Sequence, residues 1–395
     1  MKLRLKARRV ILGAGVAGAL ALGAVMSVTA ASASGGTILI GSIAGTTGAY
    51  GSTGVAMENG AQLAVDALNA AGGALGKQFT LQKYNDQASA TLASQLFQRL
   101  VSAGAVAIAG SGDTGPSTAA MADRLQVPDI GAVDDAGITI YPNGPAKPPL
   151  PWVWSWGLNT FAFGGIDASY SLKHCKGLAL LHDPASYGDG GEAGIKLVLS
   201  KAHQKLAVDD AITEDWSSGA TVGLTNEIDK IKASHASCVV VWLTPQDTAR
   251  FMETIKSSGV NVTILGNDEI DADTTFSGLA GSAGNGAVGA ELTSQLHPSA
   301  ALVSFEKRYQ KKFRIAATPF AIANYDAVML LGKVIKQEKS TNAAKLRAGL
   351  NTVKGYKGLQ GTVTFSPQNH ATVVQSQLTL VKYDAAAKAW KPFAW

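Results

Sequence analysis

The stretch 37-TILIGSIAGTTGAYGSTGVAMENGAQLAVDALNAAGG-73 decides the fold class of this chain. Residues 37–43 form an apolar run of the length of a buried strand, and residues 55–71 repeat apolar side chains at the spacing of a helix. Gly72 and Gly73 end that helix. A buried strand that leads through a glycine-rich loop into a helix is the building unit of parallel sheets, so the stretch predicts an α/β protein.

The same alternation continues toward the C-terminus in two series. The first series has predicted strands at 37–43, 79–84, 106–109, 130–133 and 153–156, and predicted helices at 55–71, 90–103 and 117–125. The second series has predicted strands at 177–181, 207–212, 239–243 and 262–265, and predicted helices at 192–203, 222–233 and 246–257. Two such series exceed one compact domain, so we predict two doubly wound parallel-sheet lobes.

The remaining segments are too few to enclose a third core. They comprise predicted helices at 300–312 and 319–336 and predicted strands at 362–365 and 377–383. If they complete both lobes, the chain crosses between the lobes more than once, near Gly157, Leu292 and Ser366. This predicts lobe 1 at 35–158 and 292–366, lobe 2 at 159–291 and 367–395, and a multi-strand hinge between them.

Residues 1–34 have the composition of an export signal. They contain a basic start, an apolar stretch at 10–28 and small residues at 30–34. A membrane anchor is the alternative, but the glycine content of the apolar stretch and the small-residue end favour removal. Arg8 and Arg9 also resemble a twin-arginine signal, which leaves both export routes open. Because no Cys lies directly after the apolar stretch, we expect a protein without a lipid anchor in the periplasmic, extracellular or cell-wall space.

The net charge of +5 is confined to this leader. Five of the 34 basic residues lie at positions 2–9, and the other 29 balance the 29 acidic residues. Non-specific binding to nucleic acid requires an excess of Lys and Arg, so this class of function is excluded as the main activity.

Several short motifs along the mature chain resemble one family. They are Gly41-Ser42-Ile43-Ala44-Gly45-Thr46-Thr47-Gly48-Ala49-Tyr50-Gly51, Gly60-Ala61-Gln62-Leu63-Ala64-Val65, Asn69-Ala70-Ala71-Gly72-Gly73, Tyr84-Asn85-Asp86-Gln87, His182-Asp183-Pro184-Ala185-Ser186-Tyr187-Gly188-Asp189-Gly190 and Asn324-Tyr325-Asp326-Ala327-Val328. In this order the chain resembles the leucine/isoleucine/valine-binding family of type I periplasmic solute-binding proteins. The resemblance implies a monomeric protein, without cofactor, that hands a small solute to the permease of an ABC importer.

Ligands of open parallel sheets bind beyond the carboxyl ends of the strands. In the first lobe these ends are predicted at 44–52, 110–117 and 134–137, and in the second lobe at 183–189, 244–247 and 266–271. The loop 110–117 contains Asp113 and leads into a helix, so its backbone NH groups and the Thr114 and Ser117 hydroxyls can hold a carboxylate. The resemblance implies that Thr114 contacts a ligand carboxylate, whereas a helix cap is the alternative role. Thr244 has the corresponding position in the second lobe.

The resemblance also implies aromatic walls and an acid at the ligand. Tyr50 and Tyr187 lie on Tyr-Gly loops of opposite lobes. The acid that faces a ligand amine aligns best with Asp268, and Glu269 is its neighbour.

One loop departs from the family pattern. Where amino-acid binders carry an Ala-Ala-Thr-like segment, this chain has Val133-Asp134-Asp135. Carboxylates at Asp134 and Asp135, with Asp113 nearby, would repel a ligand carboxylate but accept hydrogen bonds from ammonium groups or hydroxyls. Amino acids or their derivatives therefore lead as ligands, and aromatic acids, amides or polyols follow.

Trp152, Trp154 and Trp156 alternate along a predicted strand, so we expect all three on one face of it. Core packing is the ordinary role of such residues. Trp156 lies closest to the predicted ligand edge and is the candidate for stacking on a ring or sugar face.

Cys175 and Cys238 precede the first and third strands of the second series. In the doubly wound order these strands are neighbours, so we predict a disulfide outside the cytoplasm. A zinc site that adds His174 and His235 is the alternative.

Two other functions compete with transport. Gly110-Ser111-Gly112-Asp113-Thr114-Gly115 fits the dinucleotide fingerprint, and Asp134 and Asp135 follow about twenty residues later, so an exported NAD(P)-dependent oxidoreductase is one alternative. An extracellular sensor domain with the same fold is the other. The sequence contains no G-x-S-x-G, H-E-x-x-H, Walker lysine or Cys-x-x-Cys motif, so we predict a binding protein rather than an enzyme.

Overall fold

The apolar run near residue 40 forms a buried strand. In the computed structural model this strand is β1 (Ile38–Ala44), and every residue of it except Leu39 is buried. The structure describes residues 36–48, 51–110, 112–131, 136–144, 147–157, 159–184, 186–214, 222–267, 270 and 274–395. These residues contain three sheets, and the two large ones confirm the predicted doubly wound architecture.

The first large sheet has five parallel strands in the order β2-β1-β3-β4-β5. Its other strands are β2 (Phe79–Asn85), β3 (Ala107–Ala109), β4 (Asp129–Gly131) and β5 (Val153–Ser155). The helical segments that follow its strands are α1 (Gly51–Ala70), α2 (Ala90–Ser102), η1 (Gly112–Thr114), α3 (Gly115–Leu125) and α4 (Ala136–Ile140). The five predicted strands and three predicted helices are confirmed, although α1 begins four residues before the predicted start.

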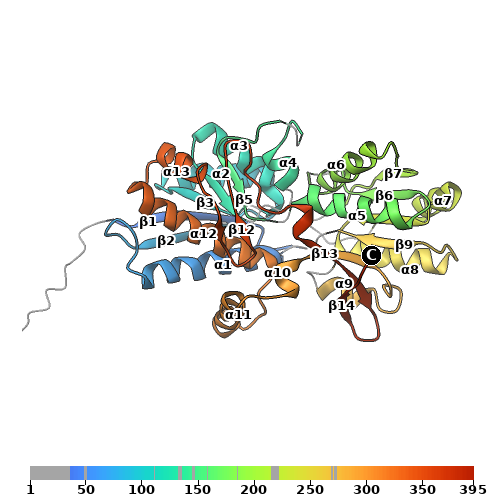
Figure 1. Cartoon of the computed structure of the whole chain (residues 1–395). Helices are drawn as coiled ribbons and strands as arrows, with labels where there is room; N and C mark the ends of the chain where they lie inside the picture. The colour runs from blue at the N-terminus through green and yellow to red at the C-terminus, as the bar shows by residue number, and fades with distance from the viewer. Residues whose placement is uncertain are drawn as a thin grey trace, which may run out of the picture. The chain divides into compact units, whose positions relative to one another are not determined.

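The second large sheet repeats this order. Read from one edge it runs β7-β6-β8-β9-β10 in parallel, and then β13 and β14 add antiparallel strands. The strands are β6 (Leu178–His182), β7 (Val208–Ala211), β8 (Cys238–Trp242), β9 (Thr263–Gly266), β10 (Val288–Leu292), β13 (Leu378–Asp384) and β14 (Ala389–Pro392). Its helices are α5 (Thr160–His174), α6 (Ser186–Lys201), α7 (Thr225–Ser234), α8 (Pro245–Ser257) and α9 (Thr274–Leu279), several of which Figure 1 labels.

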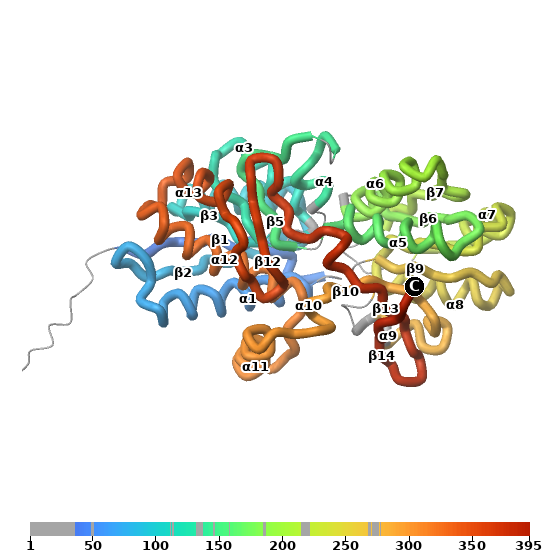
Figure 2. Tube along the Cα trace, in the orientation of Figure 1, coloured from blue at the N-terminus to red at the C-terminus, as the bar shows by residue number. Residues whose placement is uncertain are grey.

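The C-terminal third is divided between the two large sheets. Helix α12 (Pro319–Glu338) packs along α1 and contacts β3 and β4, whereas β13 and β14 extend the second sheet. The other elements of this third are α10 (Thr293–Leu296), α11 (Ala300–Phe313), α13 (Ala343–Leu350), β11 (Tyr356–Lys357), β12 (Thr362–Val363) and η2 (Gln375–Gln377). The chain therefore passes between the sheets after β5, after β10 and after β12, a path that can be followed in Figure 2.

Two of these connections are joined to each other. Ser155 N donates a hydrogen bond to His370 O at 2.9 Å, and Asn159 Nδ2 donates to Val373 O at 3.0 Å. The segment before α5 and the segment before β13 therefore run side by side. The residue limits of the two lobes stay a prediction.

Helix α12 lies against α1 at a glycine. A Cβ placed on Gly60 would lie 1.9 Å from Ala321 O, so only a residue without a side chain allows this approach of the two helices. The contact joins residues about 260 positions apart and closes the core of the first sheet.

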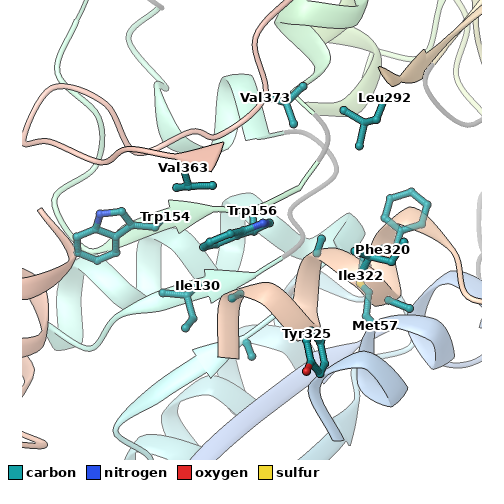
Figure 3. Close-up of a cluster of buried hydrophobic side chains, with 14 of the residues drawn as sticks. Met57, Ile130, Trp154, Trp156, Leu292, Phe320, Ile322, Tyr325, Val363 and Val373 are labelled. Carbon is teal, nitrogen blue, oxygen red and sulfur yellow. The ribbon is translucent and has the colours of Figure 1, made fainter. Parts of the chain in front are cut away.

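The tryptophans before and in β5 are buried, but they do not share one face. Trp154 and Trp156 belong to a cluster that contains Ile130 and Ile322, and Figure 3 labels these four side chains. Trp152 belongs to a separate cluster. The expectation that all three lie on one face was wrong, because the strand begins only at Val153 and Trp152 precedes it.

None of the helices in the described ranges combines the length and the hydropathy needed to cross a membrane.

Candidate ligand-binding site

At the carboxyl end of the first sheet, a buried aspartate holds the hydroxyl of Thr114. Asp86 follows β2 and is completely buried, and its carboxylate accepts a hydrogen bond from Ala88 N at 3.0 Å. Thr114 Oγ1 donates to the other carboxylate oxygen at 2.6 Å. Burial raises the pKa of Asp86, and the hydrogen bonds from Thr114 and Ala88 lower it in part.

The hydrogen bond to Asp86 tests one of the two roles that the sequence allows for the Thr114 hydroxyl, namely the helix cap and the ligand contact. Thr114 stands at the N-cap of α3, but its side chain makes no cap hydrogen bond. Because its proton is donated to Asp86, the hydroxyl acts as an acceptor toward a further partner. The helix-cap role is therefore wrong, and the ligand contact stays a prediction.

The carboxyl ends of β3 and β4 lie so close together that the glycines there, Gly110 and Gly131, have no space for a side chain. Gly110 has φ +83°, and a Cβ there would lie 2.5 Å from Asn324 Nδ2. A Cβ on Gly131, which has φ +143°, would lie 2.3 Å from Gly110 N. The buried carboxamide of Asn324 in α12 thus lies beneath both strand ends, and backbone groups rather than side chains form this part of the edge.

The loop after β1 is tied to the end of β2. Thr46 N donates to Asn85 Oδ1 at 3.0 Å, and Asn85 Nδ2 donates to Thr47 Oγ1 at 3.0 Å. Asn85 therefore positions the glycine-rich loop that precedes α1 in the opening stretch of the fold.

At the carboxyl end of the second sheet, Thr244 is bound to a buried acid that the sequence did not predict. Thr244 caps α8 by accepting from Asp247 N at 3.2 Å. Its hydroxyl donates to Glu214 Oε1 at 2.9 Å, and its backbone N lies 3.1 Å from both carboxylate oxygens. The Glu214 carboxyl group thus lies next to the N-cap residue of α8.

Glu214 and Asp247 form a carboxyl pair. Burial and the neighbouring carboxyl group of Asp247 together raise the pKa of Glu214 to about 9, and the hydrogen bonds from Thr244 lower it only in part. Asp247 is buried and also accepts from Val222 N at 3.0 Å. We therefore expect the pair to hold one proton near neutral pH. No local pattern pointed to Glu214, because it lies beyond the edge strand β7.

Tyr187 and Trp156 are both enclosed by other side chains. The ring of Tyr187, in the first turn of α6, lies 5.7 Å from that of Trp242, and Tyr187 is 6% exposed. Trp156 is 2% exposed and meets the rings of Tyr356 and Phe365 edge-on, at 5.5 and 6.1 Å. Both residues are part of the core in this structure, and their contacts to a ligand stay predictions.

Trp156 also lies near the buried carboxylate of Asp326 and lowers the pKa of that group in part. That carboxylate accepts from Leu359 N at 2.7 Å and from Gln360 N at 3.1 Å. Burial nevertheless raises the pKa of Asp326 to about 7. The Asn-Tyr-Asp motif of α12 thus fastens the segment between β11 and β12 to the first core.

The remaining predicted ligand contacts cannot be compared with the structure. Tyr50, Asp134, Asp135, Asp268 and Glu269 lie outside the described residues. Asp113 is described only in its backbone, which belongs to η1.

The predicted disulfide is confirmed. Cys175 and Cys238 are bonded, with 5.7 Å between their Cα atoms, at the amino end of the second sheet where Leu178 of β6 pairs with Cys238 of β8. Both sulfurs are used in this bond, so a zinc site with His174 and His235 would lack its thiolates.

The stretch Gly110–Gly115, which fits the dinucleotide fingerprint, does not lead directly from a strand into an α-helix. After β3 the chain forms η1 before α3 begins, and Pro116 takes one of the first positions of α3. A proline there has no NH to offer a pyrophosphate.

Comparison with known proteins places the same fold and motifs in one family. A family model described as "Periplasmic binding protein" matches residues 37–388. The Leu/Ile/Val-binding protein BraC3 of Rhizobium johnstonii is 26% identical over 367 residues, which cover 88% of this chain and 92% of that protein.

Solved structures agree with this fold. A periplasmic binding protein type 1 from Bordetella pertussis Tohama I superimposes with a TM-score of 0.80 at 22% identity, over 90% of this chain and 100% of that chain. A solute-binding protein of an ABC transporter from Rhodopseudomonas palustris BisB5, in complex with 3,4-dihydroxy benzoic acid, gives a TM-score of 0.71 at 20% identity, over 88% and 93% of the two chains.

Proposed function

Because this chain belongs to the periplasmic binding protein family, whose members bind solutes and are not enzymes, we propose that it captures one small polar solute between two lobes and delivers it to an ABC importer. The family membership excludes the oxidoreductase that the Gly110–Gly115 stretch suggested. The finer parts of the proposal, namely the solute, the importer and the position of the site, rest on the features below.

One observation carries the proposal. Both large sheets have the same doubly wound strand order, and each has its loops at the carboxyl ends of parallel strands. We assign 35–158 and 292–366 to lobe 1 and 159–291 and 367–395 to lobe 2. Three passages of the chain between the sheets then supply a hinge about which the lobes close on a solute.

An amino acid or a related compound is the leading ligand class. The matched relative from Rhizobium johnstonii is named for Leu, Ile and Val, whereas the Rhodopseudomonas palustris structure holds an aromatic acid. The contacts that we assign to lobe 1 are Tyr50, Asp113, Thr114, Asp134, Asp135 and Trp156, and those of lobe 2 are Tyr187, Thr244, Asp268 and Glu269.

The polarity of the first sheet's edge favours a ligand group that donates hydrogen bonds. Thr114 gives its proton to Asp86, so it offers lone pairs to a ligand. Asp113, Asp134 and Asp135 add carboxylates to the loops after β3 and β4. We therefore place an ammonium, amide or hydroxyl group of the ligand against this edge rather than its carboxylate.

A binding screen tests the function. The protein recovered from the exported fraction is melted with amino acids, aromatic acids, amides, polyols and NAD(P), and each hit is titrated calorimetrically. A solute at a hundred times its Kd stabilises the folded protein by about 2.7 kcal/mol, so its melting temperature rises by a few degrees. Stabilisation by NAD(P) alone, or by no solute class, would overturn the proposal.

Two variants test the assigned contacts. Thr114→Ala and Tyr187→Ala are expected to weaken binding of the identified solute severalfold while the far-UV spectrum stays unchanged. Thr254→Ala is the matched control, because the Thr254 hydroxyl donates within α8, to Arg250 O at 2.8 Å. Unchanged affinity in both variants would remove these two residues from the site but would leave the family function intact.

A further inference from the structure

A buried histidine at the end of β6 faces carboxylates from two other elements. His182 is the last residue of β6 and is 4% exposed. Its Nε2 lies 3.8 Å from Glu192 Oε1 of α6 and 3.8 Å from Asp209 Oδ1 of β7. Asp189, one turn before Glu192 on α6, brings a third carboxylate 3.7 Å from His182 Nδ1. Figure 2 labels α6, β6 and β7 close to one another.

A backbone carbonyl group determines which nitrogen of the His182 imidazole carries the proton. His182 Nδ1 lies 3.2 Å from the backbone carbonyl oxygen of Asp183, which can only accept, so Nδ1 carries a proton. A ligating histidine commonly has this arrangement, in which one ring nitrogen donates to a carbonyl and the other is free to bind a metal. Within the described part of the chain, Nε2 makes no hydrogen bond, because both carboxylate oxygens lie beyond hydrogen-bond distance.

The distances between the candidate ligand atoms are somewhat longer than the distances between ligands of one bound ion. Nitrogen and oxygen ligands lie about 2.1 Å from Zn²⁺, so two ligands of one ion are at most about 4.2 Å apart, and about 3.4 Å apart in a tetrahedron. The ligand atoms of His182, Asp189 and Glu192 all lie within 4.8 Å of one another. Coordination of one ion therefore requires these atoms to approach one another by up to about 1.4 Å, which rotations of the partly exposed Asp189 and Glu192 side chains of α6 can supply.

Lys196 already neutralises part of this charge. Its Nζ bonds Glu192 Oε1 and lies 2.7 Å from Asp209 Oδ2. The carboxylate of Asp209 therefore uses its two oxygens separately, Oδ2 for the lysine and Oδ1 for the space beside His182. One lysine against three carboxylates leaves two negative charges beside the buried imidazole.

We propose that His182, Asp189, Glu192 and Asp209 bind one divalent cation of the zinc type. One imidazole and several carboxylates form a donor set that zinc accepts, and the spacing of Asp189 and Glu192 puts both on one face of α6. The ion would tie α6, whose first turn carries Tyr187, to β6 and β7. None of these four residues is among the solute contacts assigned above, so metal binding can be measured without knowing the solute.

The test begins with metal binding to the whole exported protein. After EDTA treatment and dialysis, Zn²⁺ is titrated calorimetrically and in a thermal-shift assay. We expect one ion per chain, a melting temperature raised by several degrees, and reversal by EDTA. Glu192→Gln and Asp209→Asn should each weaken Zn²⁺ binding at least tenfold. Asp210→Asn is the matched control on the same strand, because Asp210 pairs with Lys230 instead, at 3.0 Å.

A lysine variant separates a metal site from a plain ion-pair network. Lys196→Met removes the competing cation and should tighten Zn²⁺ binding severalfold. If the group is only an ion-pair network, the same variant lowers the melting temperature and Zn²⁺ does not restore it. The proposal is overturned by that result, by several weak ions per chain, or by equal losses of binding in Asp209→Asn and Asp210→Asn.

Discussion

Asp129, the first residue of β4, is a carboxylate buried with little compensation. It is completely buried, and the nearby Thr118 donates its own hydrogen bond to Gly115 O at 3.1 Å. Burial raises the pKa of Asp129 to about 7, and the Thr118 hydroxyl lowers it only in part. The folded protein therefore prefers the protonated carboxyl, so the stability from this group is present in acid and is lost as the pH rises toward 7.

Asp129→Asn should remove this loss. The gain in the free energy of unfolding, measured by urea denaturation from pH 4 to 9, should grow with pH and level off above about pH 8, at no more than about 4 kcal/mol. Asp229→Asn, at an exposed position of α7, is the control with no such trend. A gain for Asp129→Asn that does not change with pH would contradict this explanation.

His370 has the opposite dependence on pH. Its Nδ1 donates to Val153 O at 2.9 Å, and its ring stacks on Trp154 at 4.5 Å. Burial, with a smaller contribution from the charge of Arg347, lowers the pKa of His370 to about 4. The neutral ring is favoured in the folded protein, so its contribution is present above about pH 6.5 and is lost as the pH falls toward 4.

His370→Gln should flatten the acid side of the stability curve. Between pH 7 and 4 the native protein should lose up to about 3 kcal/mol more than this variant, as followed by tryptophan fluorescence in urea. His297→Gln changes an exposed histidine and should keep the native pH dependence. Parallel curves for native protein and His370→Gln would show that protonation of His370 does not destabilise the fold.

Single residues differed in how far their partners could be predicted. The pair of Cys175 and Cys238 was predictable, because each cysteine has a definite place next to a strand and the doubly wound order makes those strands neighbours. Glu214 was not predicted as the partner of Thr244, because 30 residues separate them and nothing in the loop after β7 indicates where its side chain points. The sequence predicts at which edge of the sheet a loop residue lies. Its hydrogen-bond partner can be identified only from the folded structure.

Among the elements, helix α5 and strand β10 were not predicted. Ten of the fifteen residues of α5 are buried, so its apolar residues surround the helix instead of forming one periodic stripe. Strand β10 has the sequence VGAEL, in which Gly289 and Glu291 weaken the strand signal. The contacts of α5 and β10 with neighbouring elements determine their structure. In contrast, β1, α2 and α8 could be predicted from the spacing of apolar residues in their own sequences.

The contact between α1 and α12 leads to a prediction at the scale of elements. Gly60→Ala places a methyl group on Ala321 O, so the helices must separate, and we expect a loss of about 1 to 3 kcal/mol in urea denaturation. Gly278→Ala in α9 is the matched control, because open space surrounds that position and alanine favours a helix. Equal effects of the two substitutions would show that the helices adjust without cost.

At the scale of the whole molecule, the disulfide limits the freedom of the unfolded chain. The bond spans 63 residues, and replacing both cysteines by serine should lower the free energy of unfolding by about 4 kcal/mol. The native protein with reductant should then unfold at the same urea concentration as the double variant. Thiol titration of the exported, unfolded protein without reductant should find no free thiol. A free thiol, or no response to reductant, would contradict the bond.

The passages of the chain between the sheets have a consequence for biosynthesis. Helix α12 must pack on α1, and β13 and β14 must join β10, before either sheet has all its neighbours. Translation of the first two hundred residues therefore supplies neither sheet with its full set of neighbours. Both sheets are completed only when nearly the last codon has been translated.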